Sequence, residues 1–99
     1  MNRIQRTRTR GAKLPPNTLC VTRGTLFGND YKISETVTRE EAVNKFRLHI
    51  RNPMFEWKIK AFMERCKRDG IKHIACWCKL NDICHGDVWL EIWNERIER

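Results

Sequence analysis

The spacing of two strand-like segments constrains the fold of this chain more than any other feature. Residues 18–22 (TLCVT) and 71–79 (IKHIACWCK) are rich in β-branched and apolar side chains and are flanked by Asn or Gly, as strands often are. The long segment between them carries two helical patterns, so the two strands cannot form a hairpin and would pair in parallel. The sequence therefore predicts a small α/β domain with the order β-loop-α-α-β-loop-α.

Start and stop signals define three helices in the sequence. Residues 38–41 form a capping box, in which the Thr hydroxyl and the Glu carboxylate satisfy opposed backbone donors. Asn52-Pro53 ends this first helix, and Gly70 ends the second. The second helix has an apolar stripe at helical spacing. The stripe contains Phe55, Ile59, Phe62, Met63 and Cys66. The last helix is predicted over residues 86–96.

The first 17 residues differ in composition from the rest of the chain. They contain no acidic residue, and Pro15-Pro16 lies near their end, which is typical of a flexible basic arm. The cations of this arm are Arg3, Arg6, Arg8, Arg10 and Lys13. We therefore predict an arm over residues 1–17 and a single domain over residues 18–99, which is enough chain for one small core.

The net charge of +8 and the pI near 9.7 predict attraction to polyanions. Nucleic acid (DNA or RNA) or a nucleotide is the expected partner, with the cations of the arm placed on phosphates. In the alternative interpretation, the arm is a solubilising tail without a specific role. The sequence has no apolar run of bilayer-spanning length and no signal peptide, so we expect no membrane partner and a cytoplasmic protein.

The segment over residues 76–85 contains three of the five cysteines and one histidine. Side chains alternate along a strand, so Cys76 and Cys78 would project to one side and Trp77 to the other. Cys84 and His85 follow a polar turn and precede the last helix, near its positive end. An odd number of cysteines without a signal peptide favours reduced thiols or a metal site over a disulfide framework.

Three interpretations of this segment remain open. Cys76, Cys78, Cys84 and His85 have the ligand types and number of a zinc site, although their spacing differs from that of common zinc motifs. Alternatively, Cys84 is a catalytic thiol whose pKa is lowered by the helix N-terminus and His85, with Asp87 orienting the imidazole. In the third interpretation, Cys76 and Cys78 are small buried apolar residues and His85 caps the helix.

A loop with two glycines follows the first predicted strand. Parallel strands would bring this loop to the same sheet edge as the cysteine segment, where α/β proteins bind ligands. Its free backbone N–H groups, its arginine and the nearby helix start would suit an anion such as a phosphate. The candidate phosphate-binding residues are Arg23, Gly24, Thr25, Gly28 and Asn29. Alternatively, the glycines serve only a tight turn, because the loop matches no known nucleotide-binding motif.

The order of these motifs resembles a phage and bacterial family, the domain of unknown function 4326. That family has a strand ending in Gly-Arg, a Ser-x-x-Gly-Asn-Pro-Phe loop, an Arg-Glu-Glu-Ala helix, a Leu-x-Cys-Trp-Cys strand and a Cys-His-x-Asp-Val-Leu helix start. The matching residues run in order from Thr18 to about Asn94. They are Arg23, Thr25, Gly28, Asn29, residues 38–42, residues 75–78 and residues 84–90.

The sequence departs from the family pattern at the loop and after the cysteine strand. Thr22 replaces a glycine, Asp30-Tyr31 replace Pro-Phe, and Leu80 stands where a proline is common. Asp30 places a negative charge beside the expected anion site. The resemblance implies the family's fold and a phage or bacterial source, so the expected location is the cytoplasm of a bacterial host cell. It implies no activity, because none is assigned to the family.

These observations leave three functions open. The first is a small module that binds nucleic acid or a nucleotide through the basic arm and the strand-end site. The second is an enzyme that acts on a nucleotide or nucleic acid through Cys84 or His85. The third is a phage inhibitor of a host defence protein. We favour the binding module, because catalysis usually needs a nucleophile, a base and an orienting group, and only one loop of this sequence offers candidates for these roles.

Overall fold

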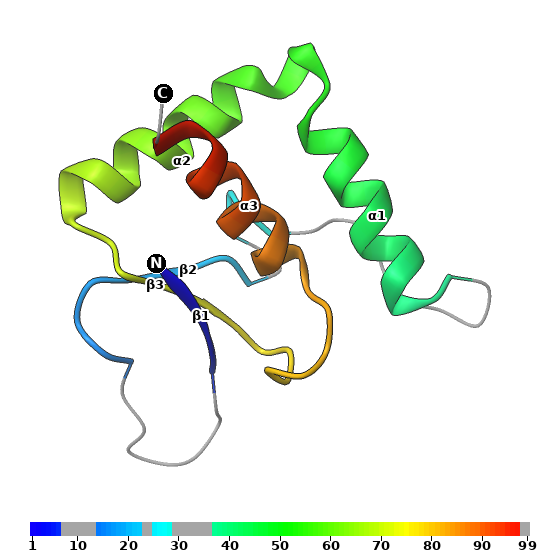
Figure 1. The fold of residues 1–99 in the computed structure, drawn as a ribbon, viewed down its shortest axis with the longest axis horizontal. Helices are drawn as coiled ribbons and strands as arrows, with labels where there is room; N and C mark the ends of the chain where they lie inside the picture. The colour runs from blue at the N-terminus through cyan, green and yellow to red at the C-terminus, as the bar shows by residue number, and fades with distance from the viewer. Residues whose placement is uncertain (7–13, 23–24, 29–36, 98–99) are drawn as a thin grey trace.

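The computed structural model describes residues 1–6, 14–22, 25–28 and 37–97. These residues form a mixed α/β domain with parallel strands, which confirms the fold class predicted from the sequence (Figure 1). The elements in chain order are β1 (Asn2–Gln5), β2 (Thr18–Cys20), α1 (Arg39–Ile50), the 3-10 turn η1 (Pro53–Phe55), α2 (Glu56–Asp69), β3 (His73–Cys76) and α3 (His85–Ile97).

In the part of the chain that the structure describes, the strands form one sheet with the order β1-β3-β2. Ile74, in the central strand β3, lies opposite Arg3 of β1 and Leu19 of β2, and both pairings are parallel. The apolar strand β3 is therefore covered by a neighbour on each side. The two helical segments between β2 and β3 supply the long connection that parallel pairing needs.

Strand β1 corrects the prediction of a flexible arm over residues 1–17. Asn2–Gln5 pair with β3, so the folded part of the chain includes residues before Thr18. These residues are mostly polar, and their strand forms through pairing with residues far along the chain, which a local sequence pattern cannot reveal. The predicted arm residues Arg8, Arg10 and Lys13 lie outside the described residues.

Local capping signals set the helix boundaries as predicted. The hydroxyl of Thr38 accepts a hydrogen bond from the Glu41 backbone N–H at 3.2 Å, and α1 begins at the next residue after Thr38. The side chain of Asn52 accepts a hydrogen bond from the Met54 N–H at 3.0 Å and starts η1. Gly70 ends α2 with φ of 59°, in the left-handed region that glycine adopts most readily.

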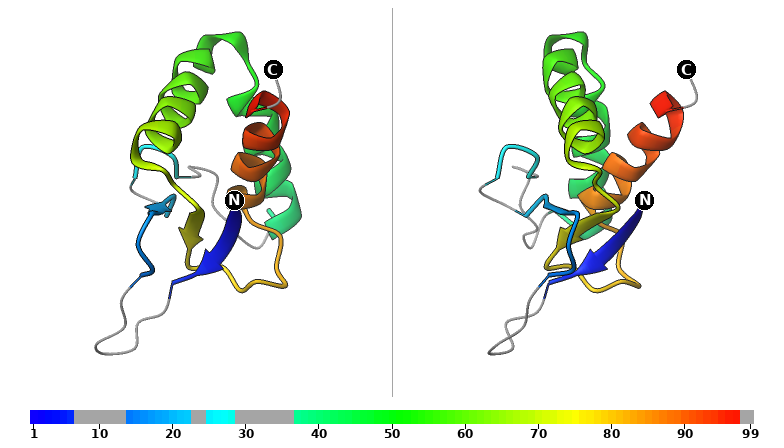
Figure 2. Two further views of the ribbon diagram at one scale, coloured as in Figure 1. Left: turned by 60° about the vertical axis from the view of Figure 1, so that its left-hand side comes forward. Right: turned by 90° about the vertical axis from the view of Figure 1, so that its left-hand side faces the viewer.

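The helices lie over one face of the sheet (Figure 2), and the buried apolar side chains of the described residues form one core cluster between them. The sheet contributes Leu19, Val21, Ile74 and Cys76, which share that face. At the centre lies Trp89 of α3, which is fully buried and packs against aromatic rings from the Thr25–Gly28 turn, α1 and α2. The core thereby fixes α3, and its first turn, over the end of β3.

The longest helix among the described residues is α2, which has 14 residues. Crossing a bilayer takes about 20 consecutive apolar residues in a helix. No helix in the described ranges has the length and apolar character for such a span.

Candidate functional site

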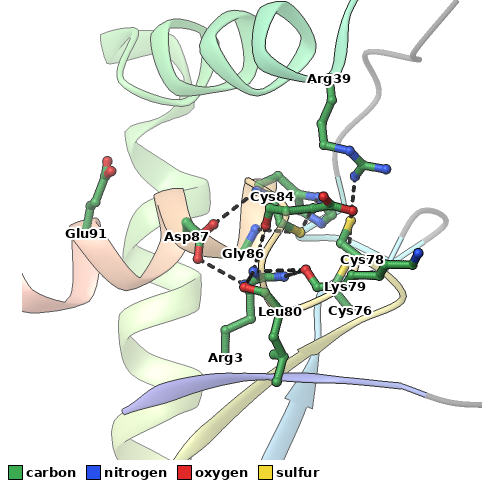
Figure 3. Close-up of polar contacts among 12 residues, drawn as sticks. Arg3, Arg39, Cys76, Cys78, Lys79, Leu80, Cys84, Gly86, Asp87 and Glu91 are labelled. Atoms are coloured by element: carbon green, nitrogen blue, oxygen red, sulfur yellow. Dashed lines mark hydrogen bonds and ion pairs between the residues drawn. The ribbon is translucent and has the colours of Figure 1, made fainter.

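Three cysteine side chains meet where β3 ends and α3 begins (Figure 3). The Sγ atoms of Cys76 and Cys78 lie 3.6 Å apart, so these two side chains lie together as predicted, although β3 ends at Cys76 and Cys78 lies in the bend that follows it. The Sγ atom of Cys84 joins them, and all three sulfur atoms lie within 4.8 Å of one another. Cys76 and Cys84 are buried and Cys78 is half-buried. We call these three residues the cysteine cluster.

The dimensions of the cysteine cluster match those of a thiolate metal site. A zinc–sulfur bond is about 2.3 Å long, and tetrahedral geometry then separates two sulfur ligands by about 3.8 Å. The distance of 3.6 Å between the Cys76 and Cys78 sulfurs is close to this value. The three cysteines could therefore bind a metal ion with only small adjustments of their side chains.

Arg39, the first residue of α1, reaches the cysteine cluster from the helix layer (Figure 3). Its Nη1 atom donates a hydrogen bond to Cys78 Sγ at 3.2 Å. Hydrogen bonds from the thiols of Cys76 and Cys84, assisted by the Arg39 guanidinium, lower the pKa of Cys78. No local sequence pattern indicates this contact, since Arg39 belongs to the capping-box pattern of a distant helix.

The pKa values of the other two thiols of the cysteine cluster are shifted in the opposite direction. Hydrogen bonds to Cys76 and Cys78, together with burial, raise the pKa of Cys84. The hydrogen bond to Cys78 and burial raise the pKa of Cys76. In the metal-free cluster, Cys78 is therefore the thiol that loses its proton most readily. The predicted lowering of the Cys84 pKa by the helix N-terminus is wrong, because the neighbouring thiols and burial outweigh the helix end.

His85 lies beside the cysteine cluster and is buried. Its Nε2 atom hydrogen-bonds the backbone carbonyl oxygen of Val21, the residue after β2. Its Nδ1 atom lies 3.7 Å from Cys84 Sγ. His85 is not one of the residues whose donor atoms all lie within 4.8 Å of one another. The structure thus brings three of the four predicted metal ligands together and places the fourth next to Cys84.

Asp87 does not have the orienting role that the catalytic interpretation requires. Its Oδ1 atom accepts a hydrogen bond from Arg3 Nε at 3.0 Å, and its Oδ2 atom accepts one from the Cys84 N–H at 3.0 Å. The nitrogens of His85 meet Val21 and Cys84 instead. Asp87 therefore caps the start of α3, which is the ordinary role of an acidic residue in a first helical turn.

The predicted nucleic-acid-binding residues Arg3 and Arg6 have different surroundings. The Arg3 side chain is only 6% exposed and donates hydrogen bonds within the protein, unlike the exposed arm residue that the composition predicts. Its neighbours are far along the chain, which is why composition alone assigned it to an exposed arm. The Arg6 guanidinium lies over the half-exposed Trp77 ring, 4.4 Å from its centre.

Only part of the predicted phosphate loop lies within the described residues. The Thr25 hydroxyl donates a hydrogen bond to the Thr22 carbonyl oxygen at 2.7 Å, and the Gly28 N–H donates to the Thr25 carbonyl oxygen at 3.1 Å. These contacts form a turn that packs on α3, where the Trp89 indole N–H donates to the Phe27 carbonyl oxygen. The remaining candidates, Arg23, Gly24 and Asn29, lie outside the described residues.

A comparison with known protein families gives one match. The model of the family described as "Domain of unknown function (DUF4326)" matches residues 4–95, which include the whole cysteine cluster, β2, α1, α2, β3, most of α3 and the second half of β1. No curated protein and no solved structure matches the chain.

Proposed function

Because this chain belongs to the DUF4326 family, whose description assigns no activity, we propose a function from the site itself: a small zinc-binding module that binds nucleic acid or a nucleotide. The observation that carries this proposal is the convergence of the three cysteine sulfurs within 4.8 Å at the carboxyl end of the sheet. Zinc is the first-choice metal, because soft thiolates in tetrahedral arrangement favour it over the hard cations magnesium and calcium.

His85 is the proposed fourth ligand. The Val21 carbonyl oxygen can only accept a hydrogen bond, so the His85 Nε2 atom must carry the proton. In the neutral ring, Nδ1 is then the unprotonated nitrogen, which is the form that ligates a metal, and this atom lies 3.7 Å from Cys84 Sγ. Metal-bound histidines commonly donate their other ring N–H to a backbone carbonyl in this way. With His85, the cysteine cluster would form a Cys₃His ligand set.

Arg39 also supports a metal site. Three thiolates and one zinc ion carry a net charge of −1, which is costly to bury without a neighbouring cation. The Arg39 guanidinium donates to Cys78 Sγ at 3.2 Å and is placed to offset that charge. Hydrogen bonds of this kind from the surroundings of a metal site hold its ligands in position.

The nucleic-acid part of the proposal depends on the cations and the aromatic ring beside the cysteine cluster. Trp77 and Lys79 are exposed, and Arg6 lies over the Trp77 ring. Aromatic rings stack on bases, and cations contact phosphates without regard to sequence. The net charge of +8 adds long-range attraction to any polyanion. We call Arg6, Trp77 and Lys79 the basic-aromatic surface.

The zinc proposal is tested by native mass spectrometry of protein purified without chelator, with chelation as the second arm. We expect one zinc ion per chain, its loss from Cys78→Ser, and its retention in the matched control Cys20→Ser, since Cys20 lies outside the cluster. Removal of zinc should lower the melting temperature of wild type. Metal-free wild type with an unchanged melting temperature and no zinc uptake would contradict the proposal.

The nucleic-acid proposal is tested by fluorescence anisotropy with labelled single-stranded and duplex oligonucleotides at several salt concentrations. We expect binding that weakens steeply with salt, because contacts to phosphates release counterions. Lys79→Gln should reduce the slope of log affinity against log salt by about 1, and Trp77→Ala should weaken binding to single strands. The matched control is Lys67→Gln, which removes the same charge from α2. Wild type that does not bind at low salt would rule out this part.

A further inference from the structure

We infer that Arg3 is a positioning residue of the zinc site, so that zinc binding and the docking of strand β1 stabilise each other. This inference rests on the proposed function, because it requires that the cysteine cluster binds zinc. Arg3 contacts none of the proposed ligand atoms and lies near the opposite end of the chain from them. Its side chain instead contacts the groups that hold the ligands in place (Figure 3).

The Arg3 guanidinium is the hub of the turn that connects Cys78 to Cys84. Its Nη2 atom donates to the carbonyl oxygens of Leu80 at 2.9 Å and Asp82 at 2.8 Å, and both Nη atoms lie 3.3 Å from the Lys79 carbonyl oxygen. Among the described backbone groups, the hydrogen bond within this turn runs from the Asp82 N–H to the Lys79 carbonyl oxygen. The shape of the turn therefore depends largely on a side chain from β1.

A second route leads from Arg3 to the ligands through α3. Arg3 Nε donates to Asp87 Oδ1, and the other oxygen of Asp87 accepts the backbone N–H of Cys84. The Arg3 side chain also lies across the first turn of α3, where a Cβ atom on Gly86 would come within 3.1 Å of Arg3 Cδ. Arg3 thus fixes the backbone at Cys84 as well as the turn before it.

The backbone just after β1 contacts Cys76, the remaining cysteine of the cluster, directly. The Arg6 N–H, immediately after β1, donates to the Cys76 carbonyl oxygen at 2.7 Å. The N-terminal segment therefore positions all three cysteines. The Arg3 side chain holds the turn between Cys78 and Cys84, and the backbone pairing with β3 holds Cys76. A lysine could not replace Arg3. A single ammonium group has three N–H donors on one atom and cannot reach both the Asp87 carboxylate and the three turn carbonyls that the planar guanidinium contacts.

Mutual stabilisation follows from linkage. If zinc binds the docked form of β1 more tightly than the undocked form, zinc must favour docking by the same factor. Strand β1 has four residues and lies at the edge of the described sheet, so it belongs to the class of elements that open locally without global unfolding. Zinc should therefore suppress that opening.

The experiment combines zinc competition against a chromophoric chelator with hydrogen exchange of wild type. Arg3→Lys should bind zinc about 10-fold to 100-fold more weakly, which is the usual effect of losing a group that holds a ligand. The matched control Arg68→Lys alters an arginine of α2 that is 72% exposed, and should stay within about twofold of wild type. In wild type, zinc should slow exchange of the amides in residues 2–6 more than those of α2.

Two results would overturn the inference in different ways. If wild type binds zinc and Arg3→Lys binds it with equal affinity, the coupling is refuted and the zinc proposal stands. The same conclusion follows if wild type binds zinc but exchange at residues 2–6 is not slowed. Absence of zinc binding by folded wild type would refute the proposed function and the inference together. The exchange experiment uses wild type alone, so it decides the question even where Arg3→Lys does not fold.

Discussion

The Arg39 guanidinium lies 3.2 Å from the sulfur of Cys78 and joins the first turn of α1 to the end of the central strand. This contact gives one thiol of the cysteine cluster a cationic partner, while Cys76 contacts the other thiols and Cys84 contacts those thiols, the His85 ring and the Gly86 backbone N–H. The cluster is therefore asymmetric. In the metal-free protein, its half-buried member has a lowered pKa and its two buried members have raised pKa values.

The first prediction concerns the reactivity of Cys78 in metal-free protein. Arg39→Ala removes a hydrogen bond that lowers the Cys78 pKa, so the midpoint of its alkylation against pH should move upward by about one pH unit. Peptide mass spectrometry after iodoacetamide treatment measures this midpoint for each cysteine. Arg47→Ala, on the same helix but paired with Glu91, is the control and should leave the midpoint unchanged. An unchanged midpoint in Arg39→Ala would contradict the assignment.

The second prediction is a loss of stability at alkaline pH that depends on Cys66. Burial raises the pKa of the Cys66 thiol to about 12, whereas the thiol of an unfolded chain titrates near about 8.5. Below the pKa of the unfolded chain, the Cys66 thiol is protonated in both the folded and the unfolded state. Its full contribution to the free energy of unfolding is then present. As the pH rises toward 12, only the unfolded chain loses the proton, so the free energy of unfolding decreases.

Cys66→Ala removes this titration and keeps every other ionisable group. The difference in unfolding free energy between wild type and Cys66→Ala should therefore shrink between about pH 8.5 and pH 11. Urea denaturation of metal-free, reduced protein at a series of pH values measures this difference. A difference that is constant over that range would show that Cys66 titrates alike in both states.

The third prediction concerns the close approach of Arg3 to Gly86. Alanine normally favours a helix over glycine by about 1 kcal/mol. Here the added Cβ would lie 3.1 Å from Arg3 Cδ, whose guanidinium is fixed by hydrogen bonds, so Gly86→Ala should destabilise the fold by about 1–2 kcal/mol. The penalty should disappear in an Arg3→Ala background, which a double-mutant cycle measures by denaturation. Additive effects would mean that the two residues do not interact.

The fourth prediction concerns the centre of the core. Trp89 is fully buried, and its indole N–H donates to the Phe27 carbonyl oxygen at 2.8 Å. Trp89→Phe leaves a cavity and an unpaired carbonyl, so it should lower the free energy of unfolding by about 2–4 kcal/mol. The control Trp57→Phe alters a side chain that is 55% exposed and should cost no more than about 0.5 kcal/mol. Equal effects on urea denaturation would contradict the central position of Trp89.

Several features of the site could be predicted because their cause lies within a few residues. Cys76 and Cys78 lie two residues apart, at the end of β3 and just beyond it, and the position of Cys84 before α3 brings it to the same end of the sheet. The direction of the His85 ring could not be predicted. It depends on the Val21 carbonyl, which lies 64 residues away in sequence.

The sequence by itself determined the parts of this protein that local rules control. These are the capped helix starts, the glycine end of α2, the apolar stripes, and the parallel pairing that a long helical connection imposes. The tertiary structure alone decided that residues 2–5 form a strand beside β3 and that one thiol of the site has a cationic partner. Arg3 becomes an internal hydrogen-bond hub and Arg39 the partner of Cys78, because side-chain burial and long-range hydrogen bonds depend on distances in space rather than on neighbours in sequence.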